Sequence, residues 1–257
     1  MNGETGGPSS GGPTVRVFDD VAALSRAAAD ALAEVAAKAV RQHGRFRVAL
    51  SGGSTPQALF KLLAHAPYHD RVSWSRTFVF WGDERCVPPT SADSNYRMAR
   101  ETLLFHVPVP ATQVYRMPGE AADPEAGARL YEMSLRRAFA LAPGEMPRFD
   151  LILLGMGSDG HTASLFPHTS ALRVTDRLVV ANRVEKLNTT RLTLTVPVLN
   201  NAATVLFLVA GDDKAGALKA VLRGPKHPEE YPAQLVAPHD GELVWLVDRA
   251  AAAGLVS

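Results

Sequence analysis

Short apolar segments alternate with longer amphipathic segments along most of the chain. The pattern predicts strands, in order, over 14–18, 46–50, 77–81, 149–154, 191–196, 203–210 and 242–247. It predicts helices over 19–42, from Pro56 onward, and over 94–104, 123–141 and 212–222. Strands that alternate with helices in this way indicate an α/β fold, with a Rossmann-like, mainly parallel sheet flanked by helices.

Local residues support several of these boundaries. Asp19 or Asp20 is a suitable N-cap for the first helix, and Gly44 is a suitable stop. Pro56 suits the first position of the second helix. The run 149–154 is apolar at nearly every position, which is typical of a strand covered on both faces.

Residues 1–13 differ in composition from the rest of the chain. They are rich in glycine, serine and proline, and have neither a basic start nor an apolar core. We therefore expect a flexible tail rather than a secretory signal. No linker divides the remainder, so we expect a single domain over 14–257.

Overall composition narrows the range of partners. Among 257 residues, 27 Lys and Arg balance 26 Asp and Glu, which leaves a formal charge of +1. Near-neutrality argues against a nucleic-acid or membrane partner, which a broad positive field would favour. Cys86 is the single cysteine, so no internal disulfide forms, and we expect a cytoplasmic protein. Nothing in the sequence fixes the oligomeric state, and a monomer is the simplest expectation.

The first segment with candidate chemistry follows the strand 46–50. Gly52 and Gly53 allow the backbone to approach a ligand closely, and Ser54 and Thr55 add hydroxyl groups. A helix N-terminus behind such a loop offers free amides to an anion. The alternative is a tight turn with an ordinary helix cap.

The second segment follows the strand 77–81 and contains Asp83, Glu84 and Arg85 in succession. An arginine at the ligand end of the sheet can bind a phosphate or a carboxylate with two parallel hydrogen bonds. A salt bridge within the loop, together with an N-cap at Ser94, is the alternative interpretation.

The third segment follows the strand 149–154 and matches G-x-G-x-x-G through Gly155, Gly157 and Gly160. A dinucleotide site would need a full helix after the last glycine, but Pro167 leaves little room for one. Asp159 would also lie within the pyrophosphate loop and repel the ligand. The match therefore gives only weak support to a nicotinamide-dependent dehydrogenase.

The same segment suits proton transfer better. His161 can exchange a proton near neutral pH, and Asp159, two residues earlier, can orient and stabilise the imidazole. Neither an accompanying cysteine nor an H-E-x-x-H motif points to a metal. A purely structural histidine is the alternative.

The fourth segment leads into the strand 191–196 and includes its first residue. Lys186 and Arg191 can meet a phosphate from the side opposite the first loop. A charged loop that faces water is the alternative, unless the other segments enclose the same ligand.

Taken together, four motifs resemble the 6-phosphogluconolactonase family. They are LSGGSTP, WGDERCVPPTSADSN, FDLILLGMGSDGHTASLFP and K-x-x-x-x-R-L-T-L-T, in the family's order and over most of residues 15–250. The resemblance implies a fold of the ribose-5-phosphate isomerase/CoA-transferase-like group. It further implies hydrolysis of 6-phospho-D-glucono-1,5-lactone, the second step of the oxidative pentose phosphate pathway, without a metal or organic cofactor.

The resemblance also implies roles for individual residues. Residues 52–55, Arg85, Lys186 and Arg191 would hold the phosphate and orient the ring, with Asp83 and Gly157 in the same substrate site. His161 would take a proton from the attacking water and return it to the ring oxygen. Asp159 would hold the imidazole and favour its protonated form.

Two other functions on this fold remain open from the sequence. A sugar-phosphate isomerase or deaminase would use Asp83 and His161 for proton transfer on an opened sugar. Related deaminases continue the glycine-rich segment as DGHIAFNEP, and the glutamate of that motif is missing from residues 162–167 here. A non-catalytic sugar-phosphate sensor is the second alternative, although no DNA-reading segment precedes residue 14.

Overall fold

The computed structural model describes residues 12–255, so the predicted tail lies almost entirely outside the described residues. Two sheets form the frame of the described part. Its strands are β1 Thr14–Phe18, β2 Phe46–Leu50, β3 Thr77–Trp81, β4 Asp83–Arg85, β5 Leu151–Leu154, β6 Val179–Val184, β7 Thr189–Leu194, β8 Thr204–Val209 and β9 Glu242–Asp248. Its α-helices are α1 Val21–His43, α2 Ser54–Leu63, α3 Asn95–Ala99, α4 Pro124–Phe139, α5 Val196–Asn200, α6 Ala215–Arg223 and α7 Arg249–Ala252.

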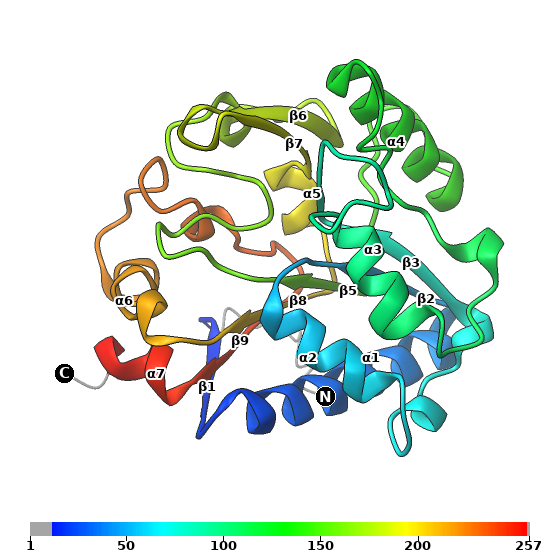
Figure 1. The fold of residues 1–257 in the computed structure, drawn as a ribbon, viewed down its shortest axis with the longest axis horizontal. Helices are drawn as coiled ribbons and strands as arrows, with labels where there is room; N and C mark the ends of the chain where they lie inside the picture. The colour runs from blue at the N-terminus through cyan, green and yellow to red at the C-terminus, as the bar shows by residue number, and fades with distance from the viewer. Residues whose placement is uncertain (1–11, 256–257) are drawn as a thin grey trace, which may run out of the picture.

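The larger sheet has six strands in the order β1-β9-β8-β5-β2-β3, and every neighbouring pair is parallel. The smaller sheet has the order β4-β7-β6 and is antiparallel. In Figure 1, α1 and α2 lie below the large sheet, while the small sheet and α4 lie above it. The predicted mainly parallel α/β fold is confirmed.

The sequence located most elements to within a few residues, and its boundary signals work as expected. The Asp20 carboxylate accepts a hydrogen bond from the Ala23 amide, and α1 ends at Gly44 in a left-handed conformation with φ of 76°. A 3₁₀ turn precedes α6 within the predicted helix 212–222.

Three predictions about individual elements were wrong. Helix α2 begins at Ser54, not at Pro56. Proline is still tolerated there, because the first turn's amides have no acceptor within the helix. The strand predicted at 191–196 begins at Thr189 and belongs to the small sheet, so Arg191 lies within it. Strands β4 and β6 were missed. β4 pairs with β7 from far away in the chain, whereas β6 forms a hairpin with β7 through the turn Glu185–Leu187, a local feature that the sequence prediction overlooked.

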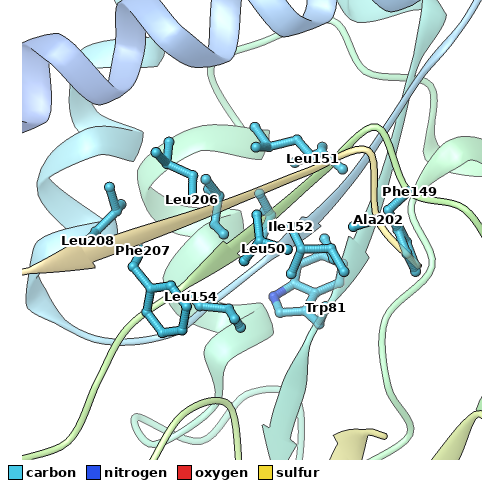
Figure 2. Packing of buried hydrophobic residues seen from close by; sticks show 14 of the residues in the cluster. Leu50, Trp81, Phe149, Leu151, Ile152, Leu154, Ala202, Leu206, Phe207 and Leu208 are labelled. Atoms are coloured by element: carbon cyan, nitrogen blue, oxygen red, sulfur yellow. The ribbon is translucent and has the colours of Figure 1, made fainter. Parts of the chain in front are cut away.

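Apolar side chains from both faces of the large sheet form the core. All four residues of β5 are fully buried, as predicted for a doubly covered strand. Figure 2 shows Phe207 on the side of β8 opposite Leu206 and Leu208. The Phe207 ring stacks on Trp245 with centroids 3.7 Å apart. Each large buried side chain contributes roughly 1.5–3 kcal/mol, so the core fixes the strands whose ends carry the loops described below.

Among the residues that the structure describes, no helix has both the length and the apolar character needed to cross a bilayer.

Candidate active site

A cleft of about 430 Å³ lies where the carboxyl ends of β2, β3, β5 and β8 meet the small sheet. Ligands of open parallel sheets bind at these strand ends. The lining draws on each of the four segments and on one further loop: Ser51, Gly52, Gly53, Ser54, Thr55, Pro56, Asp83, Arg85, Asn95, Gly155, Met156, Gly157, His161, Ala163, Arg191, Leu208, Val209, Ala210, Asp213 and Lys214.

The glycine-rich loop before α2 presents an open helix N-terminus to this cleft. Gly53 is the N-cap residue with φ of +102°, and no side chain caps the helix. Gly52 leaves no room for a side chain, because a Cβ there would lie 1.9 Å from the Asn95 Oδ1. Free amides and the positive end of the helix dipole therefore face the space where an anion would bind.

A second glycine-rich turn holds His161 against Asp159. The Asp159 Oδ1 lies 2.5 Å from the His161 Nδ1 and also accepts a hydrogen bond from the His161 amide. Gly157 is required by this packing, since a Cβ there would lie 2.0 Å from the Nδ1. Gly160 closes the turn with φ of +76°. The turn thus fixes the imidazole plane through contacts on two sides.

This arrangement makes His161 a candidate base. An ionised carboxylate only accepts hydrogen bonds, so the Nδ1 carries the proton and the Nε2 keeps its lone pair. Burial lowers the pKa of His161 to about 4; Asp83 raises it in part, and Arg191 and Lys214 lower it further. The imidazole is therefore neutral at pH 7. The effect of Asp159 on the protonated form stays a prediction, because the lowered pKa reflects burial together with the charges of Asp83, Arg191 and Lys214.

The G-x-G-x-x-G match lacks the structure that a dinucleotide site needs. After Gly160 the chain forms a turn with a bridge between Thr162 and Leu165. The next helical residues are a short 3₁₀ turn at Ser170–Arg173. No helix N-terminus thus follows the last glycine to receive a pyrophosphate.

Arg85 and Arg191 are directly opposite each other in the antiparallel pair β4–β7. Both line the cleft. Within residues 12–255 neither guanidinium forms a salt bridge, although Arg85 donates to the Asp93 carbonyl and the charges of Asp83 and Glu84 act on Arg191. Burial and the neighbouring Arg85 lower the pKa of Arg191. Two adjacent cations without a carboxylate partner make a strong site for an anion.

The two acidic residues before Arg85 have different roles. The Asp83 side chain lines the cleft and accepts a 2.7 Å hydrogen bond from Ser164. Glu84 is buried and accepts hydrogen bonds from the Ser94 hydroxyl and the Asn95 and Tyr96 amides. Burial raises the pKa of Glu84. Glu84 therefore anchors α3, whose N-cap is Ser94 as the alternative interpretation predicted.

Lys186 does not line the cleft as its predicted role in phosphate binding requires. It lies in a 3₁₀ turn, Glu185–Leu187, between β6 and β7, and its Nζ binds the Asp159 Oδ2. The ammonium group also lies 5.1 Å from the centre of the Phe166 ring. The carboxylate thus holds Lys186 beside Phe166 and not among the residues that line the cleft.

Lys214 joins the cleft in its place, and sequence reasoning missed it. It follows β8 in the segment GDDK and binds Asp213 at 2.6 Å. Its position after a strand of the parallel sheet was the available signal, since every such strand end is a candidate site.

As for metals, the described residues contain no cluster of three or more His, Cys, Asp or Glu side chains.

The parallel sheet, the open helix N-terminus, the paired arginines and the Asp159–His161 pair define an α/β enzyme for a small anionic metabolite. The family model for glucosamine-6-phosphate isomerases/6-phosphogluconolactonase matches residues 19–245. The chain belongs to this family.

Individual relatives agree with this assignment. A 6-phosphogluconolactonase of Synechocystis is 46% identical over 218 residues, 85% of this chain and 88% of the relative. One from Nostoc is 43% identical over 242 residues, 94% of this chain and 98% of the relative. The solved 6-phosphogluconolactonase of Trypanosoma brucei superposes with a TM-score of 0.82 at 30% identity, over 95% of this chain and 99% of that one.

Proposed function

We propose that this protein hydrolyses 6-phospho-D-glucono-1,5-lactone to 6-phospho-D-gluconate in the oxidative pentose phosphate pathway. The observation that carries the proposal is His161, whose Nδ1 lies 2.5 Å from Asp159, in the same cleft as Arg85 and Arg191, which form no salt bridge within the described residues. The family and the named relatives support the same reaction.

The cationic groups of the cleft bind the substrate phosphate. Arg85, Arg191 and Lys214 supply positive charge, and residues 52–55 supply hydroxyls and backbone amides. Charge-assisted hydrogen bonds of this kind are roughly twice as strong as neutral ones. Binding the phosphate fixes the lactone ring relative to His161, and such positioning is itself a large part of catalysis.

His161 moves the proton. Its Nε2 takes a proton from a water molecule as the water oxygen attacks the lactone carbonyl carbon, giving a tetrahedral intermediate. When the bond between that carbon and the ring oxygen breaks, the imidazolium returns the proton to the ring oxygen. Asp159 holds the Nδ1–H throughout, and the product acid then ionises. A base of this type accelerates such a step about 10²–10⁴-fold.

Location and assembly belong to the same proposal. We place the reaction in the cytoplasm, since Cys86 is the single cysteine of the sequence. We expect the enzyme to act as a monomer. Cell fractionation and sedimentation velocity test these two points.

The deciding experiment follows lactone hydrolysis above its spontaneous rate in the wild type and in His161→Gln. We expect clear catalysis by the wild type and loss of at least 10²-fold in kcat for the variant. Calorimetric titration with 6-phosphogluconate should show that the variant still binds. Ammonia release from glucosamine 6-phosphate, with no lactone hydrolysis, would replace the proposal by the deaminase alternative.

A further inference from the structure

Asp159 uses its two carboxylate oxygens for two different partners. The Oδ1 contacts the Nδ1 of His161 at 2.5 Å, and the Oδ2 binds the Nζ of Lys186. The Asp159 side chain is only 28% exposed, whereas that of Lys186 is 51% exposed. A half-exposed lysine from the small sheet therefore contacts the carboxylate that orients the histidine.

Phe166 completes the same cluster. Its ring stacks on the His161 imidazole with centroids 4.0 Å apart and planes tilted by 19°. The Lys186 ammonium lies 5.1 Å from the centre of that ring. Lys186 thus contacts two side chains that themselves contact His161, namely the Asp159 carboxylate and the Phe166 ring.

We propose that Lys186 is a positioning residue that holds the Asp159 carboxylate toward His161 and offsets its charge, so that His161 remains a neutral, correctly oriented base. Without the ammonium, the carboxylate would rotate more freely and its negative charge would favour the imidazolium. A carboxylate neutralised on one oxygen still accepts the Nδ1–H on the other. This role rests on the proposed function, and it replaces the phosphate-binding role predicted for Lys186.

Other charged groups also surround His161. Asp83 on β4 favours its protonated form, while Arg191 on β7 and Lys214 before α6 oppose it. Tyr231 packs against Gly160 in the same turn. None of these groups changes when Lys186 is replaced. A shift in the pKa of His161 on that replacement therefore reports the loss of the Lys186–Asp159 contact.

Two variants separate charge from packing. Lys186→Met keeps an apolar stem over Phe166 but removes the charge, and Lys186→Arg keeps the charge. We expect Lys186→Met to lower kcat severalfold, to leave KM nearly unchanged, and to move the acid limb of kcat/KM upward by about 0.5–1 pH unit. Lys186→Arg should restore kcat and the acid limb.

A measurement independent of activity uses NMR titration of the histidine rings. The resonance missing from His161→Gln identifies His161, and its pKa should rise in Lys186→Met. If the wild type does not hydrolyse the lactone, the proposed function fails, but this titration still tests the contact. If Lys186→Met raised KM tenfold and left the acid limb of kcat/KM at the same pH, Lys186 would be a phosphate ligand and the proposal would be overturned. An unchanged His161 pKa would also overturn it, as would equal losses of activity and melting temperature in both variants.

Discussion

Gly157 and His161 contact each other so closely that the glycine has no room for a methyl group. A Cβ at residue 157 would lie 2.0 Å from the His161 Nδ1 and 2.7 Å from the Asp159 Oδ1. The Gly157 amide also donates to the His161 carbonyl at 2.9 Å. The proposed base and its orienting carboxylate therefore depend on a glycine at this position.

Gly157→Ala should displace the imidazole and lower kcat by roughly 10²-fold, since a shift of about 1 Å in a reacting group has an effect of that order. Steady-state kinetics on the lactone measure this change. Gly216→Ala in α6 is the control, because a Cβ there meets nothing within 4 Å. Equal activity in Gly157→Ala and the wild type would show that the orientation of His161 is unimportant.

The pH dependence follows from the low pKa of His161. The base is lost only when pH falls through about 4, so kcat/KM for glucono-1,5-lactone, which has no phosphate to titrate, should be nearly flat from pH 5 to pH 8. The acid limb of kcat should lie at higher pH, because a bound phosphate offsets Arg191 and Lys214, which lower this pKa. Enzyme exposed to each pH and assayed again at pH 7 controls for unfolding. With that unphosphorylated lactone, a limb of kcat/KM near 6.5 would indicate an ordinary exposed histidine instead.

Arg191→Met should mainly weaken substrate binding. Loss of a charged hydrogen bond costs about 1.5–3 kcal/mol, which corresponds to a rise in KM of roughly 10–100-fold. Arg183→Met on the neighbouring strand β6 is the matched control, since that side chain is exposed. For glucono-1,5-lactone, which has no phosphate, KM should be the same in Arg191→Met and Arg183→Met. The same KM in both for the phosphorylated substrate would remove Arg191 from the phosphate site.

Glu84→Gln should destabilise the protein. The carboxylate accepts hydrogen bonds from the Ser94 hydroxyl and from the backbone amides of Arg85, Asn95 and Tyr96. A glutamine turns an NH₂ group toward one of these donors, so we expect the free energy of unfolding to fall by about 1–3 kcal/mol.

Urea denaturation measures that change. The control is Glu101→Gln, whose exposed carboxylate pairs only with Arg97 among the described residues and should change stability by at most about 0.5 kcal/mol. Equal stability of the two variants would mean that Glu84 does not anchor α3.

Local patterns determined much of this protein. The periodicity placed the strands of the parallel sheet, and caps such as Asp20 and Gly44 set helix ends, because these features depend on near neighbours in the chain. Asp159 and His161 are two residues apart, so their contact also follows from a single tight turn. The glycine-rich loop before α2 was predicted for the same reason.

Only the tertiary structure decided which distant side chains meet. Arg85 faces Arg191 because β4 pairs with β7, and Lys186 binds Asp159 instead of lining the cleft because the turn after β6 places it there. Lys214 enters the site because β8 is the neighbour of β5. Hydrophobic periodicity encodes which face of an element is buried, but it carries no information about which remote strand pairs with it or in what register.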